Sequence, residues 1–497
     1  MKDFSFLYLS ASTNRSSAHD SNGNMETETK ELSPIILPLG AIMNHGIIQV
    51  RVALIVAALI ASLNSSSLAA DEAGGSTVAK DPCALALLPY EGTDKLDLEI
   101  VRLQTKVRSA SDPTVWLEEL GWAFVAKARR SFDPGYYKLA EQCALCLDEK
   151  KRGCAEGLLL RAQVLHSFHK FKEAETVARE LVGKRGLNFD YGVLGDALME
   201  QGKLDDAVTA YQAMMDQKPS PQAYSRAAHI RWLKGDLPGA TELMSWAAGA
   251  SNVRDPESGA WMRVHLARYE WQSHDIKKAL ELIGESLEWL PDYAPALLER
   301  GRVLLGLGKT PEAIEALKRA TVLNPLPEYQ WTLSEALRAA DRIEEAQAVE
   351  AELKRQGAAN DPRTFSLYLA TRGEDASAAL RLAKAELETR ADVFTLDALA
   401  WAWMANADTE QAWAFAQRAV VEGTQDGRLL LHAGVIASAA GQREKAATYL
   451  AKATAIQEML LPSERKILAA TQSAKPVLTS GNRDLETIQQ PTKEKQR

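Results

Sequence analysis

Four cysteines are the residues whose type and spacing could support chemistry. Cys143 and Cys146 form a CxxC motif, Cys154 follows eight residues after Cys146, and Cys83 lies well upstream. Closely spaced cysteines can hold zinc, take part in redox exchange, or form a disulfide that stabilises a fold. The surrounding segment, AEQCALCLDEK, is composed like a helix.

Three interpretations of these cysteines remain open: a zinc site, a disulfide, and small packing residues without chemistry. A zinc site could recruit His166 and His169 as nitrogen ligands. A redox motif belongs at a helix N-terminus, whereas this CxxC lies towards the C-terminal part of the expected helix. In an exported protein a disulfide is favoured, and a loop between two helices would bring Cys146 near Cys154. The third interpretation is that the cysteines are small packing residues. We predict the Cys146–Cys154 disulfide and no metal site.

The sequence contains no pattern for nucleotide binding or nucleophilic catalysis. The Walker loop, the dinucleotide-binding glycine fingerprint, the nucleophile elbow and HExxH are all missing from it. The other histidines are scattered, and the carboxylates gather where helices are expected to begin, as at Asp205 and Asp206. We therefore predict no catalytic residue, no cofactor and no enzymatic activity.

Composition favours helices and argues against nucleic acid as a partner. Ala and Leu dominate the 497 residues, which are too many for one compact core and suit several domains or one elongated array. The formal net charge is −8, and no concentrated basic surface is visible in the sequence. The partners expected below are proteins.

An internal repeat organises most of the chain. Residues 188–221 and the segment from Ala294 carry the same residue types at the same places. Small residues occupy the eighth and twentieth places, and a glycine near the fifteenth place is typical of a left-handed helix end. Large apolar residues at the fourth, seventh, eleventh and twenty-fourth places would fill the space between two helices.

This pattern resembles the tetratricopeptide repeat. The resemblance implies an all-α fold, a right-handed superhelical solenoid of antiparallel helix pairs. Units are placed from Ala155, Asn188, Pro221, Ala260, Ala294, Pro327, Ala359, Val393 and Gly427. Their twentieth-place alanines are 32–34 residues apart, except for a step of 39 between Ala240 and Ala279, where a loop-like insertion falls.

The repeats set the predicted domain organisation. The expected segments are a disordered leader or mis-assigned start (1–42), a signal peptide (43–70), an N-terminal segment with a helical cap (71–113), a divergent first repeat (114–154), an array of about nine repeats (155–461) and a mostly disordered C-terminal end (462–497).

The segment before the array has the layout of a secretory signal. Arg51 precedes an apolar run from Val52 to Leu63, and small residues follow up to Ala70. The run is short for a membrane span, and Met43 as the true start would give a signal of ordinary length. We expect export to a periplasm or cell envelope, with no membrane domain after cleavage. An uncleaved membrane anchor is the alternative.

The resemblance also implies where a partner binds. In such arrays the first helix of each pair, helix A, lines a concave groove through its second, fifth, ninth and twelfth places. Large or forked side chains occupy these places in the central repeats, namely Trp232, Arg268, Trp271, Arg302, Trp331, Arg338 and Trp401. Trp and Arg are the residues that most often anchor interfaces. The alternative is that these tryptophans pack between successive A helices with arginines stacked on them.

The function predicted from these features is that of a protein–protein interaction scaffold. It would hold an extended segment of another protein, with acidic and apolar side chains, in the concave groove. The alternative is a non-catalytic accessory subunit of an envelope enzyme or biogenesis complex.

Overall fold

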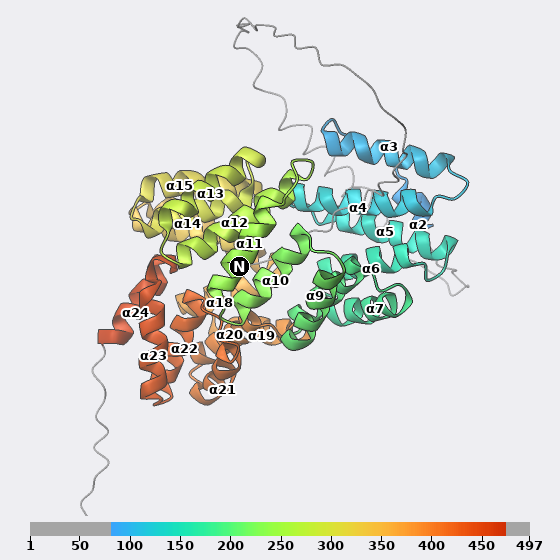
Figure 1. The fold of residues 1–497 in the computed structure, drawn as a ribbon. Coiled ribbons are helices and arrows are strands. Elements are labelled where there is room, and N and C mark those ends of the chain that lie inside the picture. Colours follow the sequence, from blue (N-terminus) through green and yellow to red (C-terminus); the bar gives the residue numbers. More distant parts are fainter. Residues whose placement is uncertain (1–80, 474–497) are drawn as a thin grey trace, which may run out of the picture. The chain divides into compact units, whose positions relative to one another are not determined.

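Paired helices make up the part of the protein that a computed structural model describes, residues 81–473 (Figure 1). Within these residues there are α-helices and one short 3-10 helix, and no strand. The predicted all-α solenoid is confirmed. The expected leader (1–42) and signal peptide (43–70) lie outside the described residues.

The helices alternate along the chain, and each A helix packs on the B helix that follows it. The A helices are α4 (Thr114–Ser131), α6 (Ala155–Ser167), α8 (Asn188–Glu200), α10 (Pro221–Leu233), α12 (Pro256–Gln272), α14 (Ala294–Gly306), α16 (Pro327–Ala339), α18 (Pro362–Arg372), α20 (Val393–Ala405) and α22 (Gly427–Ala439). The B helices are α5 (Gly135–Lys150), α7 (Phe171–Lys184), α9 (Leu204–Gln217), α11 (Leu237–Gly249), α13 (Ile276–Trp289), α15 (Thr310–Leu323), α17 (Ile343–Asn360), α19 (Ala376–Thr389), α21 (Thr409–Val420) and α23 (Arg443–Ala455).

Further helices flank these pairs. Helices α2 (Pro82–Ala86) and α3 (Lys95–Ser109) precede them, and η1 (Gln457–Met459) and α24 (Pro462–Ser473) follow. Helix α24 occupies the start of the segment 462–497, which was expected to be mostly disordered. It is held because Leu468 and Glu464 are buried against the last pairs.

Two A helices begin away from the expected starts of their units. Helix α12 begins four residues before Ala260, and α18 begins three residues after Ala359. Both begin with a proline that follows an aspartate, Asp255 or Asp361, whose side chain accepts a hydrogen bond from a backbone N–H of the first turn. These local capping groups set the helix starts more strongly than the repeat period does.

Contact between helices A and B depends on the small residues of the repeat. Ala207 is fully buried. A Cβ atom added to Gly195 would lie 2.3 Å from the ring of Tyr211, and one added to Gly301 would lie 2.4 Å from the side chain of Leu317. The glycine at the eighth place therefore lets the large residue at the twenty-fourth place lie directly against helix A.

The turn from helix A to helix B uses the left-handed backbone conformation. Gly202 and Gly235 adopt it with φ of 72° and 81°. The same turn holds His274, Asp341 and Ala407 in other repeats, with φ of 67°, 56° and 60°. Glycine is favoured at this place because a Cβ atom destabilises the conformation.

The C-terminal half of the array returns to the central repeats. Three linkers make this contact: residues 390–392 before α20, 421–426 before α22 and 456–461 before α24. They meet the C-terminal parts of α8, α10, α12 and α14, from which they are up to about 190 residues distant in sequence. The first turn of α24 meets α16 in the same way. In Figure 1 the orange helix α20 lies beside the green helix α10, and Phe394 of α20 stacks on Trp232 of α10. We call this contact the seam.

Candidate protein-binding surface

The predicted peptide-binding tryptophans are buried on the A helices. Trp331 is fully buried, Trp232 and Trp271 are each 3% exposed, and Trp401 is 7% exposed. The rings of Trp232, Trp331 and Trp401 lie against other aromatic or charged side chains of the array. These side chains therefore do not line an open groove in this structure.

Trp232 shows how this burial is achieved. Its indole Nε1 donates to Oε1 of Gln272 at 2.8 Å. Its ring stacks on Tyr269 of the next A helix and on Phe394 of α20, each with centroids 6.0 Å apart. Phe394 comes from the far side of the seam, so Trp232 joins the two halves of the array.

Trp331 and Trp401 have comparable surroundings. The guanidinium of Arg428 lies 4.5 Å from the ring centroid of Trp331, a cation–π contact across the seam. Trp401 stacks on His432 at 4.1 Å and donates its Nε1 hydrogen to Oγ1 of Thr371 at 3.0 Å.

The predicted arginines are paired within the array. Arg268 donates to both carboxylate oxygens of Glu299 at 3.2 and 2.7 Å. Arg338 makes a similar pair with Glu350 at 2.7 and 2.6 Å, and with 27% of its side chain exposed it is the most accessible of the three arginines.

Arg302 differs from the other two arginines because it also binds backbone. It donates to Glu328 at 3.3 Å and to the carbonyl oxygen of Met459, in the third linker, at 3.2 Å. The structure thus shows the packing that was the alternative to an open groove: tryptophans held between A helices, with arginines beside them.

The inner ends of the A helices bind the linkers chiefly through backbone groups. Gln272 donates to the carbonyl oxygen of Gln425, and the amide of Ser463, in the first turn of α24, donates to Glu335 at 3.0 Å. The amide of Ala391 donates to the carbonyl oxygen of Glu200 at 3.0 Å. These helix ends therefore hold backbone groups from the C-terminal half of the array.

A buried group of charges accompanies the first linker. Arg390 pairs with Glu200 from α8, and both side chains are 6% exposed. Burial raises the pKa of Glu200, and the Arg390 charge opposes that rise. Burial alone would also raise the pKa of Asp392, but Arg363 and Arg390 lower it to about 2. The pKa values of these two carboxyl groups are thus shifted in opposite directions, although both lie beside Arg390.

Two glycines allow backbones to touch at the seam. A Cβ atom on Gly202 would lie 2.4 Å from the carbonyl oxygen of Ala391. A Cβ atom on Gly235 would lie 2.7 Å from the carbonyl oxygen of Gly423. Any larger residue at either position would push the linker away.

Two open clefts flank the contact between Gly202 and Ala391. One has a volume of about 490 Å³ and an apolar side formed by Leu204, Val393 and Leu396. The other, of about 550 Å³, is lined with cations that include Lys172, Arg179, Lys203 and Arg390. Both are built from the two halves of the array, and both reach the edge of the seam.

The predicted disulfide between Cys146 and Cys154 is wrong. Cys146 is bonded to Cys83, whereas Cys143 and Cys154 are free and buried. Cys83 lies in α2, which packs on α5 and places the two sulfur atoms together. The thiol of Cys154 instead accepts a hydrogen bond from the amide of Gly157 at the start of α6.

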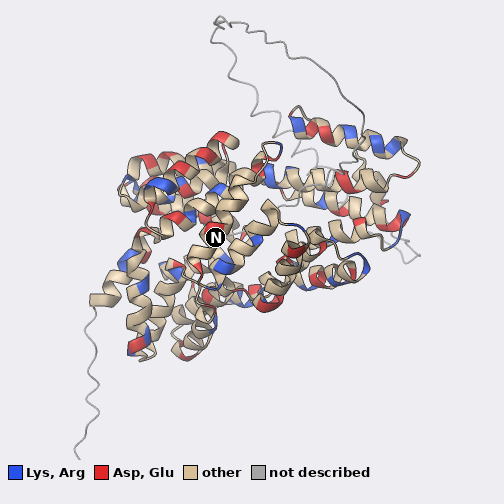
Figure 2. Ribbon diagram, in the orientation of Figure 1, with Lys and Arg blue, Asp and Glu red and all other residues tan. Residues whose placement is uncertain are grey.

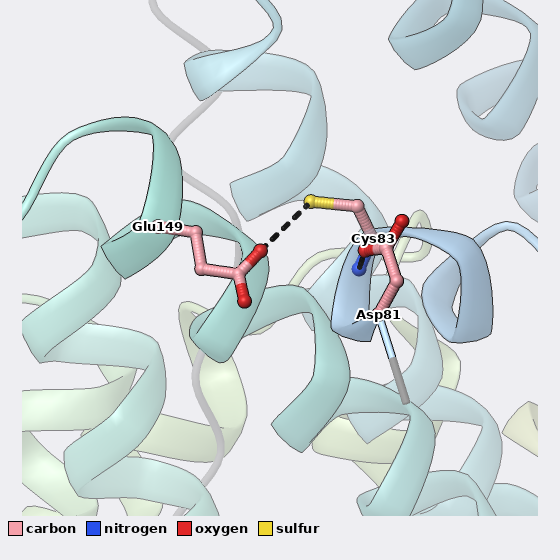
Figure 3. A group of neighbouring side chains, drawn as sticks. All are labelled: Asp81, Cys83 and Glu149. Carbon is pink, nitrogen blue, oxygen red and sulfur yellow. Dashed lines mark hydrogen bonds between the residues drawn. The ribbon is translucent and has the colours of Figure 1, made fainter. Parts of the chain in front are cut away.

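One group of possible metal ligands lies at this disulfide (Figure 3). Among the described residues, Asp81, Cys83 and Glu149 bring their ligand atoms within 4.8 Å of one another. The sulfur of Cys83 already forms the disulfide with Cys146. His166, proposed as a zinc ligand, is not in this group and lies buried against Phe171.

The sequence signals did not reveal the seam. Glu200, Arg390 and Gly202 look like ordinary repeat and linker residues, because each satisfies the local pattern. The excess of charged residues at inner places of A helices, such as Glu299 and Glu335, was the one available hint, since buried charges need partners.

The fold and the bound linkers define a class: an all-α solenoid of repeats whose helix ends hold polypeptide. Two tetratricopeptide repeat models match the sequence, over residues 193–252 and 270–333. The chain thus contains tetratricopeptide repeats over these residues. A fold of this kind supports protein–protein interaction and is generally non-catalytic.

Solved structures with similar helices include the APC/C hetero-tetramer Cut9–Hcn1, at 13% identity and a TM-score of 0.41, over 78% of this chain and 62% of that chain. The human IFIT1 dimer with PPP-AAAA matches at 15% identity and a TM-score of 0.43, over 65% and 77%. Yeast Tom70 matches at 15% identity and a TM-score of 0.30, over 76% and 92%. No curated protein matches the sequence.

Two further observations concern possible partners. Within residues 81–473 no helix is both long and apolar enough to cross a membrane. Figure 2 shows Lys and Arg interspersed with Asp and Glu on most helices, rather than gathered on one basic face.

Proposed function

We propose that this array holds a segment of another protein along the inner ends of α8–α16. The observation that carries the proposal is that these ends already hold polypeptide from elsewhere in the chain, namely the three linkers of the seam and the first turn of α24. Gln272, Arg302 and Glu335 hold them through backbone groups, which every protein segment offers. The aromatic and arginine side chains beside them supply the contacts that anchor interfaces.

Action by binding alone is part of the same proposal. The helix pairs account for nearly all of residues 114–455, so this range contains no separate catalytic domain. A scaffold acts by placing bound segments at fixed separations along a repeated surface.

Cross-linking can test the binding surface with native lysines. The chain would be mixed with a cell-envelope extract and treated with an amine-reactive cross-linker. Lys203 and Lys234 lie beside the seam, whereas Lys277 and Lys318 lie on B helices. We expect cross-links to a partner to concentrate at the first two. Cross-links concentrated at the B-helix lysines would contradict the proposal.

Export to the cell envelope is the second part of the proposal. It is supported by Arg51, the apolar run from Val52 to Leu63 and the small residues that follow. The disulfide between Cys83 and Cys146 suits an oxidising compartment. N-terminal sequencing of the protein from fractionated cells is expected to begin at Ala70 or Asp71. A mature chain that retains the apolar run in the membrane fraction would favour the anchor instead.

A further inference from the structure

The seam is built differently from the contacts along the array. Within the described residues, the close helix–helix packing of α8, α10 and α12 is with their neighbours in sequence. Across the seam these helices meet linkers and side-chain tips. The array therefore packs continuously from pair to pair, and its two halves meet in a second contact. The apolar part of that contact, Val393, Leu396 and Leu429, belongs to the same buried cluster as Trp232.

Polar groups that water can replace dominate the outer side of this contact. Lys234 pairs with Glu422 at 2.8 Å, and the two side chains are 35% and 29% exposed. Lys172 donates to the carbonyl oxygen of Glu388 at 2.9 Å. Each such bond contributes little net stability, because water can take the place of either partner. The two clefts bring solvent to the same place.

The inner side of the seam is where a partner would bind. Trp232 stacks on Phe394 there, and the linker residue Gln425 lies against Gln272. A protein segment and the linkers cannot occupy the same helix ends at once. The linkers are thus positioned as competitors of a partner.

We propose that the seam is a reversible closure. Helices α19–α24 separate from the ends of α8–α16 while the helix pairs stay folded, and only the open array admits a protein segment. This inference rests on the proposed function and adds its regulation: the array inhibits itself with its own linkers.

Hydrogen exchange of the Ala391 amide reports on the closure, because its partner is the carbonyl oxygen of Glu200 across the seam. A reversible closure predicts that this amide exchanges faster than amides inside α20, at conditions where the helices remain folded. Exchange of Ala391 only by unfolding of the whole chain would overturn the proposal.

Two glycine variants separate opening of the seam from local strain. Gly202→Ala places a Cβ atom against Ala391, whereas Gly308 has nearly the same φ, 74° against 72°, and no atom within 4 Å of an added Cβ. We expect Gly202→Ala to speed exchange at Ala391 at least tenfold and Gly308→Ala to leave it unchanged. Equal effects of the two substitutions would overturn the proposal.

Access to the inner ends can be measured with a defined probe, a fluorescent peptide with the sequence of residues 418–428. Apparent affinity scales with the fraction of open molecules, so Gly202→Ala should bind the peptide at least tenfold more tightly than the native chain. A scrambled peptide is the control for sequence-independent binding.

A covalent cross-link that keeps the seam closed tests the opposite change, and it needs no substitution in the seam. A carbodiimide can join Lys234 to Glu422 directly, because the two groups form an ion pair. Lys234 also pairs with Asp205 of α9 at 2.9 Å, so peptide mapping must identify the chains in which it is joined to Glu422. The cross-linked native chain should lose peptide binding. Binding unaffected by the lock, or peptide binding in no form of the chain, would overturn the gating.

The proposed function is tested separately. If no envelope protein cross-links beside the seam in any variant, the proposed function fails, while exchange at Ala391 and peptide binding still decide whether the closure exists.

Discussion

At the scale of single residues, the same side chain types can anchor a partner or build an interior. Trp232 and Trp331 have the bulk and the polar or cationic contacts of interface anchors, yet their contacts are all within the chain. What decides between the two roles is the surface that faces each side chain. The inner residues are therefore best tested by properties that depend on burial.

Buried His166 should make stability depend on pH. It is 5% exposed, its ring nitrogens have no hydrogen-bond partner among the described residues, and burial lowers its pKa to about 4. Between pH 6.5 and 4 the unfolded chain binds a proton at this residue that the folded chain does not. Stability contributed by the neutral ring is thus present above pH 6.5 and is lost as pH falls, by about 3 kcal/mol near pH 4.

Urea unfolding at pH 7, 5 and 4 measures this loss. His166→Leu removes the titrating group and keeps an apolar side chain, so its free energy of unfolding should fall less steeply with acid. The same acid-induced loss in both proteins would contradict the assignment.

At the scale of the helix pair, the position of a glycine determines whether its replacement by alanine lowers or raises stability. Gly195→Ala should cost about 1–3 kcal/mol, because the new methyl group meets the ring of Tyr211 at 2.3 Å. Gly284 lies inside α13 with nothing within 4 Å of an added Cβ. Gly284→Ala should stabilise by about 0.5–1 kcal/mol, because alanine is the better helix former. Thermal unfolding of both variants is the measurement, and shifts of the same sign would be inconsistent with the A–B contact described.

The disulfide fixes the first helices to the array. It closes a loop between residues separated by 63 positions, which corresponds to about 4 kcal/mol in the chain-entropy estimate. Cys83→Ser should lower the unfolding temperature and make it insensitive to reducing agent. Cys154→Ser should stay sensitive, because Cys154 is not in the bond. If the unfolding temperature of the Cys154→Ser variant did not respond to the reducing agent, Cys154 would be in the disulfide, as predicted from the sequence.

At the scale of the whole molecule, the buried pair across the seam joins residues 190 positions apart. Arg390→Leu leaves Glu200 buried without its partner and should cost about 3–5 kcal/mol. Arg319→Leu is the matched control, since its pair with Asp292 is about half exposed and water screens it, so its loss should change stability far less. Denaturant unfolding compares them, and similar losses would mean that the seam pair is not buried in solution.

Local sequence patterns predicted the helix pairs well because the groups that specify them are close in sequence. Gly195 and Tyr211 meet within one unit, and Gly202 ends a helix by its own backbone preference. The same reasoning failed for the disulfide, because the position of Cys83 depends on how α2 packs on α5. It could not decide whether the inner face is open, because no residue of α10 signals that Phe394 will lie against it.

The sequence by itself determined the repeated helix pairs, the helix starts and ends, and the kinds of side chain on each inner face. Only the tertiary structure decided that the tryptophans and arginines of that face are covered and that the array closes on its own linkers. The reason is physical. Each pair is specified by contacts within about one repeat, whereas the seam depends on the small rotation between neighbouring repeats, summed over the units that separate Glu200 from Arg390.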